Sequence, residues 1–178
     1  MIIVITRPDF FDGEAERIVQ LLSRADVDLM HIRKPQASVA AIRRLLQQLP
    51  PASYGRLVLH DHHELATDFG LHGVHLNSRY PAPPQGWRGA VSISCHSLDE
   101  LARCRKEPYA YMSLSPIFDS ISKQGYRSAF SMETLREAHR QGIIDRRVMA
   151  LGGVTFDKVS MVMEMGFGGA MILGDAWR

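Results

Sequence analysis

Polar residues that can do chemistry recur at the ends of short apolar runs along this chain. A histidine is suited to proton transfer near neutral pH, an arginine or a serine can hold a phosphate, and a carboxylate can bind Mg²⁺. In chain order these residues are His31 and Arg33, His60 and Asp61, His75 and Asn77, Ser94 and His96, and Ser113 and Ser115. If the runs are parallel strands of a barrel, their carboxyl ends meet at one face and the polar residues form one site.

Two glycine turns follow the last two apolar runs. Gly152 and Gly153 come after Val148–Leu151, and Gly174 follows Ala170–Leu173. Turns without side chains beside a helix N-terminus expose backbone N–H groups, which suit a phosphate. Glycine also serves as a plain turn residue, and for the pair alone both interpretations stay open. The remaining chain favours the phosphate site, because it repeats the same unit of strand and helix.

The run from His60 to His63 suggests a metal site, but its spacing argues against a transition metal. Such a site needs several converging ligands, whereas adjacent residues on a strand alternate between its two sides. We therefore expect His62 and His63 to begin the next helix at the surface. Asp61 is either a Mg²⁺ ligand or the cap of that helix, and the residues favour neither interpretation.

The stretch Ser115–Phe130 is long enough to be a functional loop. Within it, Ser120, Ser122 and Lys123 offer two hydroxyls and a cation to a phosphate or a diphosphate. By itself the stretch is typical of a solvated loop with turn-forming serines. Together with the glycine turns it indicates a phosphate site.

Residues two apart on a strand share one of its faces, which assigns the polar side chains to the barrel interior. The inward set is expected to be Ser92, Ser94 and His96 on the fifth run, His31 and Arg33 on the second, and His75 and Asn77 on the fourth. Cys95 then faces the helices, and we expect it to be a packed thiol rather than a nucleophile.

Eight short apolar runs alternate with helical patterns and predict a parallel sheet. The runs are Ile2–Thr6, Asp28–Arg33, Leu57–His60, Gly73–Leu76, Val91–Ser94, Tyr109–Leu114, Val148–Leu151 and Ala170–Leu173. They predict an α/β fold, a compact (β/α)8 TIM barrel, with a doubly wound open sheet as the alternative. Prolines in Asn77–Gly89 should replace the fourth helix by a loop. We expect the eighth helix to be short or missing, with a subunit interface or a truncation at that place.

Helical patterns fill the intervals between the runs. They cover about Gly13–Arg24, the segment after Ser38, Glu64–Phe69, Asp99–Arg105, Ser131–Gln141 and the segment after Thr155. Ser38, Ser97 and Thr155 are the expected N-caps. The apolar faces are expected to hold Ile18, Leu21 and Leu22 in the first helix, Val39, Ile42, Leu45, Leu46 and Leu49 in the second, and Val159, Val162, Met163 and Met165 in the last.

Composition bounds the class of protein. The chain has 178 residues, of which 46% are hydrophobic and 22% charged, which is typical of one globular domain covering 1–178. Its net charge of +2 indicates no nucleic-acid partner, and no apolar run is long enough to cross a membrane. Cys95 and Cys104 fit no metal spacing, so we expect a reducing compartment and a cytoplasmic location.

Several segments together resemble the thiamine phosphate synthase / thiazole tautomerase (TenI-like) superfamily. The similar segments are L-M-H-I-R-K-P, L-V-L-H-D-H-H-E-L-A with G-V-H-L after it, S-C-H-S-L-D-E-L, S-P-I-F-D-S-I-S-K and A-L-G-G-V-T. No single motif is decisive for the family. The motifs together cover nearly the whole chain, and their order and spacing are similar to those of the family. The resemblance implies a (β/α)8 barrel that acts in thiamine biosynthesis on phosphate and diphosphate substrates, and it is compatible with a homodimer.

The resemblance also implies roles for individual residues. Arg33 and Lys123 would hold the diphosphate and stabilise its departure, and Ser94 would contact the pyrophosphate. Asp61 would bind Mg²⁺. The rest of the expected substrate-binding set is His31, Lys34, His60, His75, His96, Ser120, Ser122, Gly152, Gly153, Leu173 and Gly174, with Gly152 and Gly153 at the thiazole phosphate.

This sequence departs from the family pattern at several positions. Pro35 stands where the motif has a lysine, for which Lys34 is the substitute, and His60 replaces an asparagine. The segment that carries the family's second Mg²⁺ carboxylate has Arg79 and Tyr80 here, which should weaken Mg²⁺ binding substantially. Pro116 occupies the place of the histidine that the tautomerases use, so the chain is atypical of either branch.

The leading hypothesis is a thiamine phosphate synthase-like transferase. The alternatives are a metal-free thiazole tautomerase, in which His31, His75 or His96 moves the proton, and a binding or regulatory protein that has lost the chemistry. A zinc hydrolase on His60 and His62 ranks last, because it needs more converging ligands.

Overall fold

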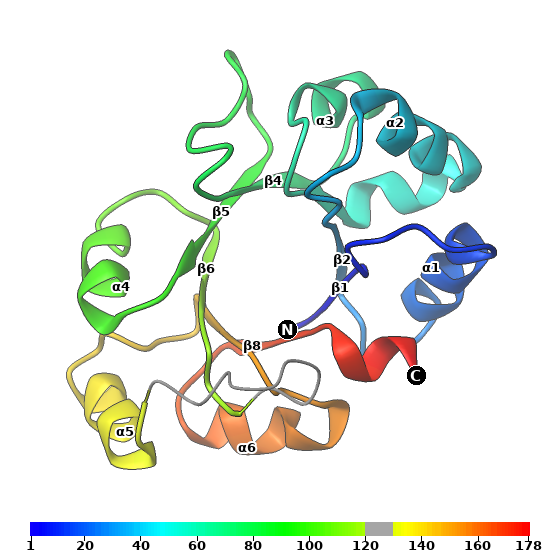
Figure 1. Ribbon diagram of the computed structural model, residues 1–178. Helices are drawn as coiled ribbons and strands as arrows, with labels where there is room; N and C mark the ends of the chain where they lie inside the picture. Colours follow the sequence, from blue (N-terminus) through cyan, green and yellow to red (C-terminus); the bar gives the residue numbers. More distant parts are fainter. Residues whose placement is uncertain (120–129) are drawn as a thin grey trace.

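The eight strands form one closed barrel in the part of the chain that the computed structural model describes, residues 1–119 and 130–178. All neighbours are parallel, each strand pairs with the next in sequence, and β8 pairs back onto β1 (Figure 1). The strands are β1 (Ile2–Ile5), β2 (Leu29–Ile32), β3 (Leu57–Leu59), β4 (Gly73–Leu76), β5 (Ala90–Cys95), β6 (Tyr111–Leu114), β7 (Val148–Leu151) and β8 (Gly169–Ile172). The predicted barrel is confirmed, and the open sheet is wrong.

The helices lie on the outside of the barrel (Figure 1). Those in the described residues are α1 (Glu14–Leu22), α2 (Val39–Gln48), α3 (Glu64–Phe69), α4 (Leu98–Cys104), α5 (Met132–Arg140) and α6 (Val159–Glu164), with three 3-10 helices η1 (Pro51–Arg56), η2 (Phe156–Lys158) and η3 (Gly174–Trp177). Ser38 and Ser97 cap α2 and α4 through their side chains, as predicted. Thr155 is the N-cap residue of η2 instead of α6 and makes no side-chain cap hydrogen bond. None of the described helices is long and apolar enough to span a bilayer.

The two predicted gaps in the helical layer are present. Between β4 and β5 a loop rich in proline projects from the barrel (Figure 1) and no helix covers that side. After β8 the chain makes only η3, which lies against the first strand through a hydrogen bond from the Trp177 indole to the Ile5 carbonyl at 2.7 Å. Arg17 of α1 also donates to the Ala176 carbonyl at 3.0 Å. This short turn lies where the eighth helix of a (β/α)8 barrel would begin.

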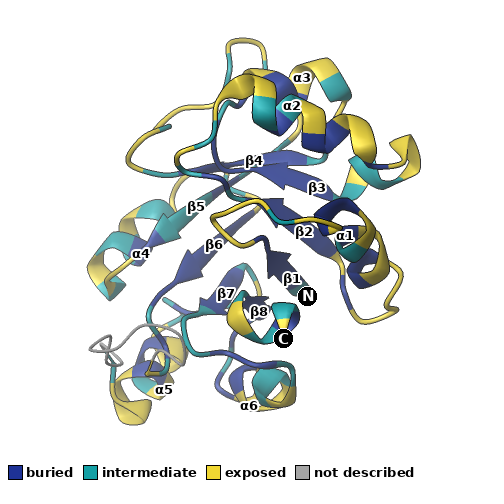
Figure 2. Ribbon diagram, turned by 45° about the vertical axis from the view of Figure 1, so that its right-hand side comes forward, coloured by how far each residue is buried: buried dark blue, intermediate teal, exposed yellow. Residues whose placement is uncertain are grey.

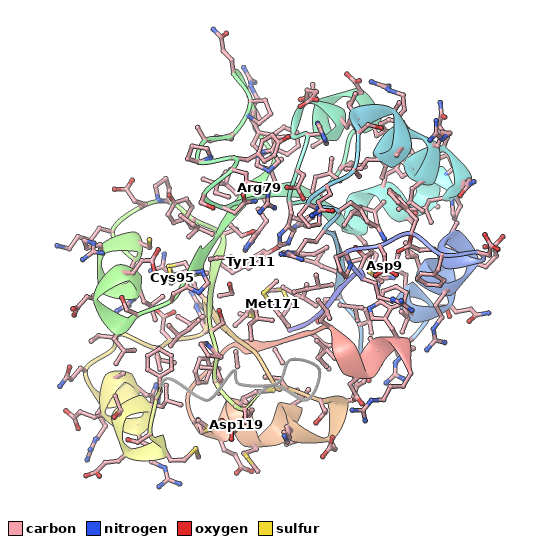
Figure 3. All side chains as sticks on the ribbon, viewed as in Figure 1. Asp9, Arg79, Cys95, Tyr111, Asp119 and Met171 are labelled. Atoms are coloured by element: carbon pink, nitrogen blue, oxygen red, sulfur yellow. The ribbon has the colours of Figure 1, made fainter. Side chains whose placement is uncertain are left out.

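Two apolar cores flank the sheet. The larger one lies between the strands and the helices, and buried side chains follow the strands while the outer helix faces are exposed (Figure 2). The smaller core fills the barrel interior; Tyr111 and Met171 lie at its centre (Figure 3). Leu29 belongs to this inner core and precedes His31 by two residues on β2. On β2 the inward face therefore changes from apolar to polar towards the carboxyl end of the strand.

Two expected helix faces are wrong in part. Val39, at the first position of α2, is 38% exposed, and Met163 is 51% exposed. Val162 and Met165 are buried as expected. Because η2 has about three residues per turn instead of 3.6, it changes the rotation at which α6 begins, and Met163 comes to face solvent.

Candidate active site

A cavity of about 680 Å³ opens at the carboxyl ends of the strands. Every strand contributes to its wall or is followed by a residue that does. In strand order these residues include Ile5, Arg33, His60, Asn77, Ser94, Ser115, Leu151 and Leu173. Arg79 and His96 also line it. This is the face on which barrel enzymes place their active sites.

Arg33 is held at the cavity wall by a threonine of the first strand's end. Its backbone N–H donates to the Thr6 hydroxyl at 2.9 Å, and that hydroxyl donates back to the Arg33 carbonyl at 3.3 Å. Burial, and then the nearby positive charge of Arg79, lower the pKa of Arg33, while Asp61 opposes them. A guanidinium stays protonated despite such shifts. Two positive groups thus line the same cavity, and Arg79 is near enough to lower the pKa of Arg33.

Arg79 forms an ion pair with Asp61 inside this wall. Its Nε and Nη2 donate to Oδ1 of Asp61 at 2.9 and 2.6 Å, and the Asp61 side chain is 3% exposed against 41% for Arg79. Asn77 shapes the turn, because its Oδ1 accepts from the Arg79 backbone N–H at 2.9 Å while its amide donates to the His60 carbonyl at 2.7 Å. Figure 3 shows Arg79 beside β4. The sequence analysis noted Arg79 only because it stands in the segment where the family has a second Mg²⁺ carboxylate, and it did not predict this ion pair.

The Mg²⁺ that the family resemblance implies does not fit this arrangement. Mg²⁺ is usually held by one or two carboxylates plus substrate phosphates. Here both guanidinium hydrogen bonds go to Oδ1 of Asp61, whose Oδ2 has no hydrogen-bond partner among the described residues. One carboxylate oxygen is thus left for an ion, and Arg79 itself stands in the segment that would carry a second carboxylate. Positive charge therefore occupies the place at which a dication would bind.

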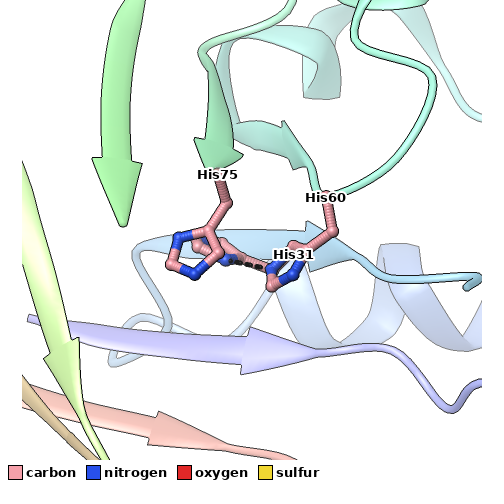
Figure 4. A group of neighbouring side chains, drawn as sticks. All are labelled: His31, His60 and His75. Atoms are coloured by element: carbon pink, nitrogen blue, oxygen red, sulfur yellow. Dashed lines mark hydrogen bonds between the residues drawn. The ribbon is translucent and has the colours of Figure 1, made fainter. Parts of the chain in front are cut away.

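His31, His60 and His75 meet inside the barrel (Figure 4). Nδ1 of His31 lies 2.8 Å from Nε2 of His60, and Nε2 of His31 lies 2.6 Å from the Tyr111 hydroxyl. The His60 and His75 rings stack with centroids 4.3 Å apart. His31 and His75 are fully buried beneath the cavity, whereas His60 is 5% exposed and lines it. Only His60 of the three is thus in reach of a ligand in the cavity.

The serines of β5 point inward as predicted and fix His75. The Ser92 hydroxyl is 2.8 Å from Nδ1 of His75, and the Ser94 hydroxyl is 2.8 Å from Nε2. Ser94 also lines the cavity. Cys95 is fully buried in the outer core, which agrees with a packed thiol. Burial raises the pKa of Cys95, so the thiolate is disfavoured.

His96 is exposed at the cavity rim. Its backbone N–H donates to a Glu100 carboxylate oxygen at 2.7 Å, and its Nδ1 lies 3.2 Å from the Ser115 hydroxyl. Of the three histidines considered for proton transfer, His96 alone lines the cavity, because His31 and His75 lie below it.

The Gly152–Gly153 turn packs against the segment that follows β6. Ile117 and Phe118 donate backbone hydrogen bonds to the Leu151 and Gly152 carbonyls at 2.9 and 3.0 Å. Both glycines have positive φ, 95° and 64°. A Cβ on Gly153 would lie 2.8 Å from Cβ of Phe118 and would collide with the Asp119 carbonyl. Both the conformation and the space therefore require glycine.

Replacing Gly153 by alanine is expected to destabilise the fold by about 1–3 kcal/mol more than replacing Gly142 does, because the added methyl group has no room. Gly142 is the matched control, since its φ is 69° and an added Cβ would meet nothing within 4 Å. Urea unfolding of both variants measures the difference. Equal destabilisation would mean that the turn can open and that the close packing has no energetic weight.

Lys34 lies outside the cavity, in a buried ion pair. Its ammonium donates to Glu14 at 2.5 Å and to the Asp9 carbonyl at 2.8 Å, and it lies 4.5 Å from the centre of the Phe10 ring. The Lys34 and Glu14 side chains are 0% and 3% exposed. Lys34 is therefore not available to a substrate in this arrangement, and we leave it out of the proposed site.

The neighbours of His60 and Asp61 differ from expectation. His63 is 3% exposed and not at the surface, because the chain turns inward at His62, whose φ is 53°. His62 instead contacts the Ala37 carbonyl through Nε2 at 2.9 Å, which takes it away from His60. Asp61 does not cap α3, whose N-cap is His63. A hydrolase centre on His60 and His62 is therefore excluded by geometry.

Three predicted residues fall outside the described part of the chain. These are Ser120, Ser122 and Lys123. Leu173 lines the cavity, and Gly174 begins η3 directly after it. Sequence reasoning missed Tyr111, the partner of His31; its place on an inward face of the sixth run was the available signal.

Comparison with known proteins gives consistent matches. A family model described as thiamine monophosphate synthase matches residues 2–174. The thiamine-phosphate synthase of Koribacter versatilis is 28% identical over 159 residues, covering 84% of this chain and 73% of that protein. The thiamine-phosphate synthase of Serratia proteamaculans is 28% identical over 66% of this chain, and the match spans 58% of that protein.

Two solved structures extend the comparison to three dimensions. A thiamine phosphate pyrophosphorylase from Bacteroides thetaiotaomicron is 41% identical with a TM-score of 0.87, covering 99% of this chain and 84% of that one. A thiamine phosphate pyrophosphorylase from Pyrococcus furiosus is 19% identical with a TM-score of 0.67, covering 98% of this chain and 89% of that one. At that identity the second likeness concerns the fold alone.

Proposed function

Because this chain belongs to the thiamine monophosphate synthase family, we propose that it joins an aminopyrimidine diphosphate to a thiazole phosphate with release of pyrophosphate. In this reaction the bond between the pyrimidine methylene carbon and the diphosphate oxygen breaks. The oxygen keeps the electron pair and leaves as pyrophosphate. The thiazole nitrogen then donates its lone pair to the resulting carbocation, and a C–N bond forms.

The observation that carries the proposal is the pair of guanidinium groups, Arg33 and Arg79, in one wall of the cavity. A diphosphate gains negative charge as it leaves, so fixed positive groups stabilise the transition state more than the ground state. Arginine suits this task because its planar fork binds phosphate oxygens in pairs. In this proposal Arg79 supplies the charge that the family resemblance assigns to Mg²⁺, and no step depends on a metal ion.

Other residues complete the proposed site. Ser94, His60 and His96 line the cavity and would orient the pyrimidine and the pyrophosphate. The Gly152–Gly153 turn with Leu173 and Gly174 would receive the thiazole phosphate. The roles of Lys123 at the diphosphate and of Ser120 and Ser122 at the thiazole phosphate rest on the family motif. A cytoplasmic location and a homodimer remain predictions from the sequence.

The test is an assay of pyrophosphate release with both substrates and the full chain. The proposal expects release that requires the thiazole phosphate. Binding of the thiazole phosphate without release, in Mg²⁺ and in EDTA alike, would contradict the transferase and leave a tautomerase or a binding protein.

Release is expected to persist in EDTA, because Arg79 provides the positive charge. Arg79→Ala should lower release in EDTA by at least about tenfold, and added Mg²⁺ should restore part of it, because Asp61 is then free to bind the ion. The control is Arg88→Ala, since Arg88 is an exposed arginine of the same loop. This variant should change the rate of pyrophosphate release neither in EDTA nor in Mg²⁺. If pyrophosphate release by the unaltered protein depends completely on Mg²⁺, the proposed role of Arg79 is wrong, whereas the proposed transferase activity is unaffected.

A metal-free tautomerase is the second candidate, favoured by the single exposed histidine at the rim of the cavity. His96 is close to Ser115 and can reach a ligand, so it is the residue that would move the proton. A proton-transfer rate on thiazole carboxylate phosphate that is lost in His96→Asn would support this candidate.

A further inference from the structure

The three histidines inside the barrel form a cluster that the proposed reaction does not use in full. One ring nitrogen from each of His31, His60 and His75 lies within 4.8 Å of the others. The residues come from β2, the end of β3 and β4, which are neighbours in the sheet. Figure 4 shows the three rings next to one another in the barrel interior, where the stacked rings of His60 and His75 would turn towards a common point to bind one ion. Convergence of several imidazoles is what a transition-metal site requires.

The surroundings keep these imidazoles in the form that binds a metal. A histidine must be neutral to donate its lone pair. Burial lowers the pKa of His31 and His60 well below the usual range, and it lowers the pKa of His75 to about 3. Burial thus favours the neutral form of each ring.

Neighbouring hydroxyl groups hold the rings in place, as the outer shell of a metal site does. Tyr111 binds Nε2 of His31 at 2.6 Å, which leaves Nδ1 directed at His60. Ser92 and Ser94 bind the two nitrogens of His75 at 2.8 Å each. One of these serine contacts would give way to a metal, and the other would continue to orient the ring.

We propose that His31, His60 and His75 together bind one transition-metal ion of the zinc class. Zinc–nitrogen bonds of about 2.0–2.1 Å place two tetrahedral ligands about 3.4 Å apart, so the His31–His60 contact of 2.8 Å must open by about half an ångström. The ion takes the place of the proton between these two nitrogens. The ring that carried this proton then holds it on its other nitrogen, which for His31 is the Nε2 that faces Tyr111, so all three imidazoles stay neutral. The fourth position of the ion faces the cavity beside His60, where water or a phosphate oxygen would bind.

The positive charge of the bound ion indicates that its fourth ligand is an anion. The three histidines are neutral, so the bound ion keeps its two positive charges in a buried place. Arg33 is near enough to act on His60 and His75 and adds to the positive potential. An anion, hydroxide or an oxygen of a phosphorylated ligand, is what balances such a centre. The metal site shares His60 with the proposed transferase site, but the binding of the ion is measured without the transferase reaction.

The test is binding of Zn²⁺ and Co²⁺ to the full chain after treatment with a chelator. One ion per chain is expected, together with the intense visible absorption of tetrahedral Co²⁺ and a rise in thermal stability with Zn²⁺. His60→Asn should weaken binding at least about 100-fold, and His75→Asn provides a second variant if the first does not fold.

The matched control is His62→Asn, which lies in the same run but contacts Ala37 instead of the cluster. Asparagine accepts the positive φ of that position. This variant should bind the ion as the unaltered chain does. Folded protein that takes up no stoichiometric ion would overturn the proposal, and so would equal losses in the His60 and His62 variants.

Discussion

Replacing Arg33 by alanine is expected to lower kcat/KM for pyrophosphate release by at least about 100-fold, the usual effect of removing one preorganised donor to a developing negative charge. The Arg33 backbone is fixed by Thr6, and Arg33 lines the same cavity as Arg79. Loss of Arg33 removes one of the positive groups that stabilise the departing diphosphate. Arg33→Lys keeps the charge without the planar fork, so its kcat/KM should lie between those of Arg33→Ala and the unaltered protein.

The control for Arg33 is Arg43→Ala. Arg43 pairs with Asp68 at 2.6 Å on the outer surface, and its side chain is 43% exposed. This variant should keep full activity. A rate for Arg33→Ala within about threefold of the control would be far from the loss that such a donor causes and would remove Arg33 from the mechanism.

The second large effect concerns the ion pair of Lys34 and Glu14. Replacing Lys34 by methionine is expected to destabilise the protein by about 3–5 kcal/mol, because it leaves a buried carboxylate without its cation. One oxygen of Glu14, Oε2, already has no hydrogen-bond partner in the described part of the chain. Burial raises the pKa of Glu14 and lowers that of Lys34, against the attraction between them. Both shifts follow from the cost of burying charge.

The double variant Lys34→Met/Glu14→Leu should recover most of this loss, since apolar pairs of similar volume often replace buried ion pairs without cost. Arg24→Met is the control: its partner is Asp26, the two side chains are 45% and 48% exposed, and such pairs contribute about 0–1 kcal/mol. Urea unfolding measures all three. If the double variant is no more stable than Lys34→Met, the loss does not come from the unpaired Glu14 carboxylate. Contacts of Lys34 with residues other than Glu14 would then carry the stability.

The barrel was predictable because its signals are local. Short apolar runs separated by helical patterns predicted each strand, and Ser38 and Ser97 marked helix starts that the structure confirms. The face of α6 was not predictable in the same way. The 3-10 turn at Phe156–Lys158 shifts this face, and the turn depends on a tertiary contact. The Phe156 N–H donates to the Asp175 carboxylate at 3.0 Å, and Asp175 lies 19 residues further along the chain.

The site was predictable as a set of strand ends but not as a set of contacts. Alternation placed Ser92, Ser94 and His75 on inward faces, where they bind one another. It did not reveal that Arg79 reaches Asp61, because the two are 18 residues apart and meet only when the loop after β4 folds back. The same limit applies to Lys34, whose partner Glu14 belongs to another helix–strand unit.

The pairing of β8 with β1 has a consequence for the order of folding. Every other strand pair joins neighbours in sequence, whereas this pair brings Ala170 beside Ile2. Formed first, it would close a loop of nearly the whole chain at an entropic cost on the order of 5 kcal/mol; formed last, it joins two edges that the curved sheet already holds close. We expect the seam to be the final part of the barrel to assemble. Since Leu173 and η3 follow β8 directly, the wall of the cavity next to the seam is then completed only when the barrel closes.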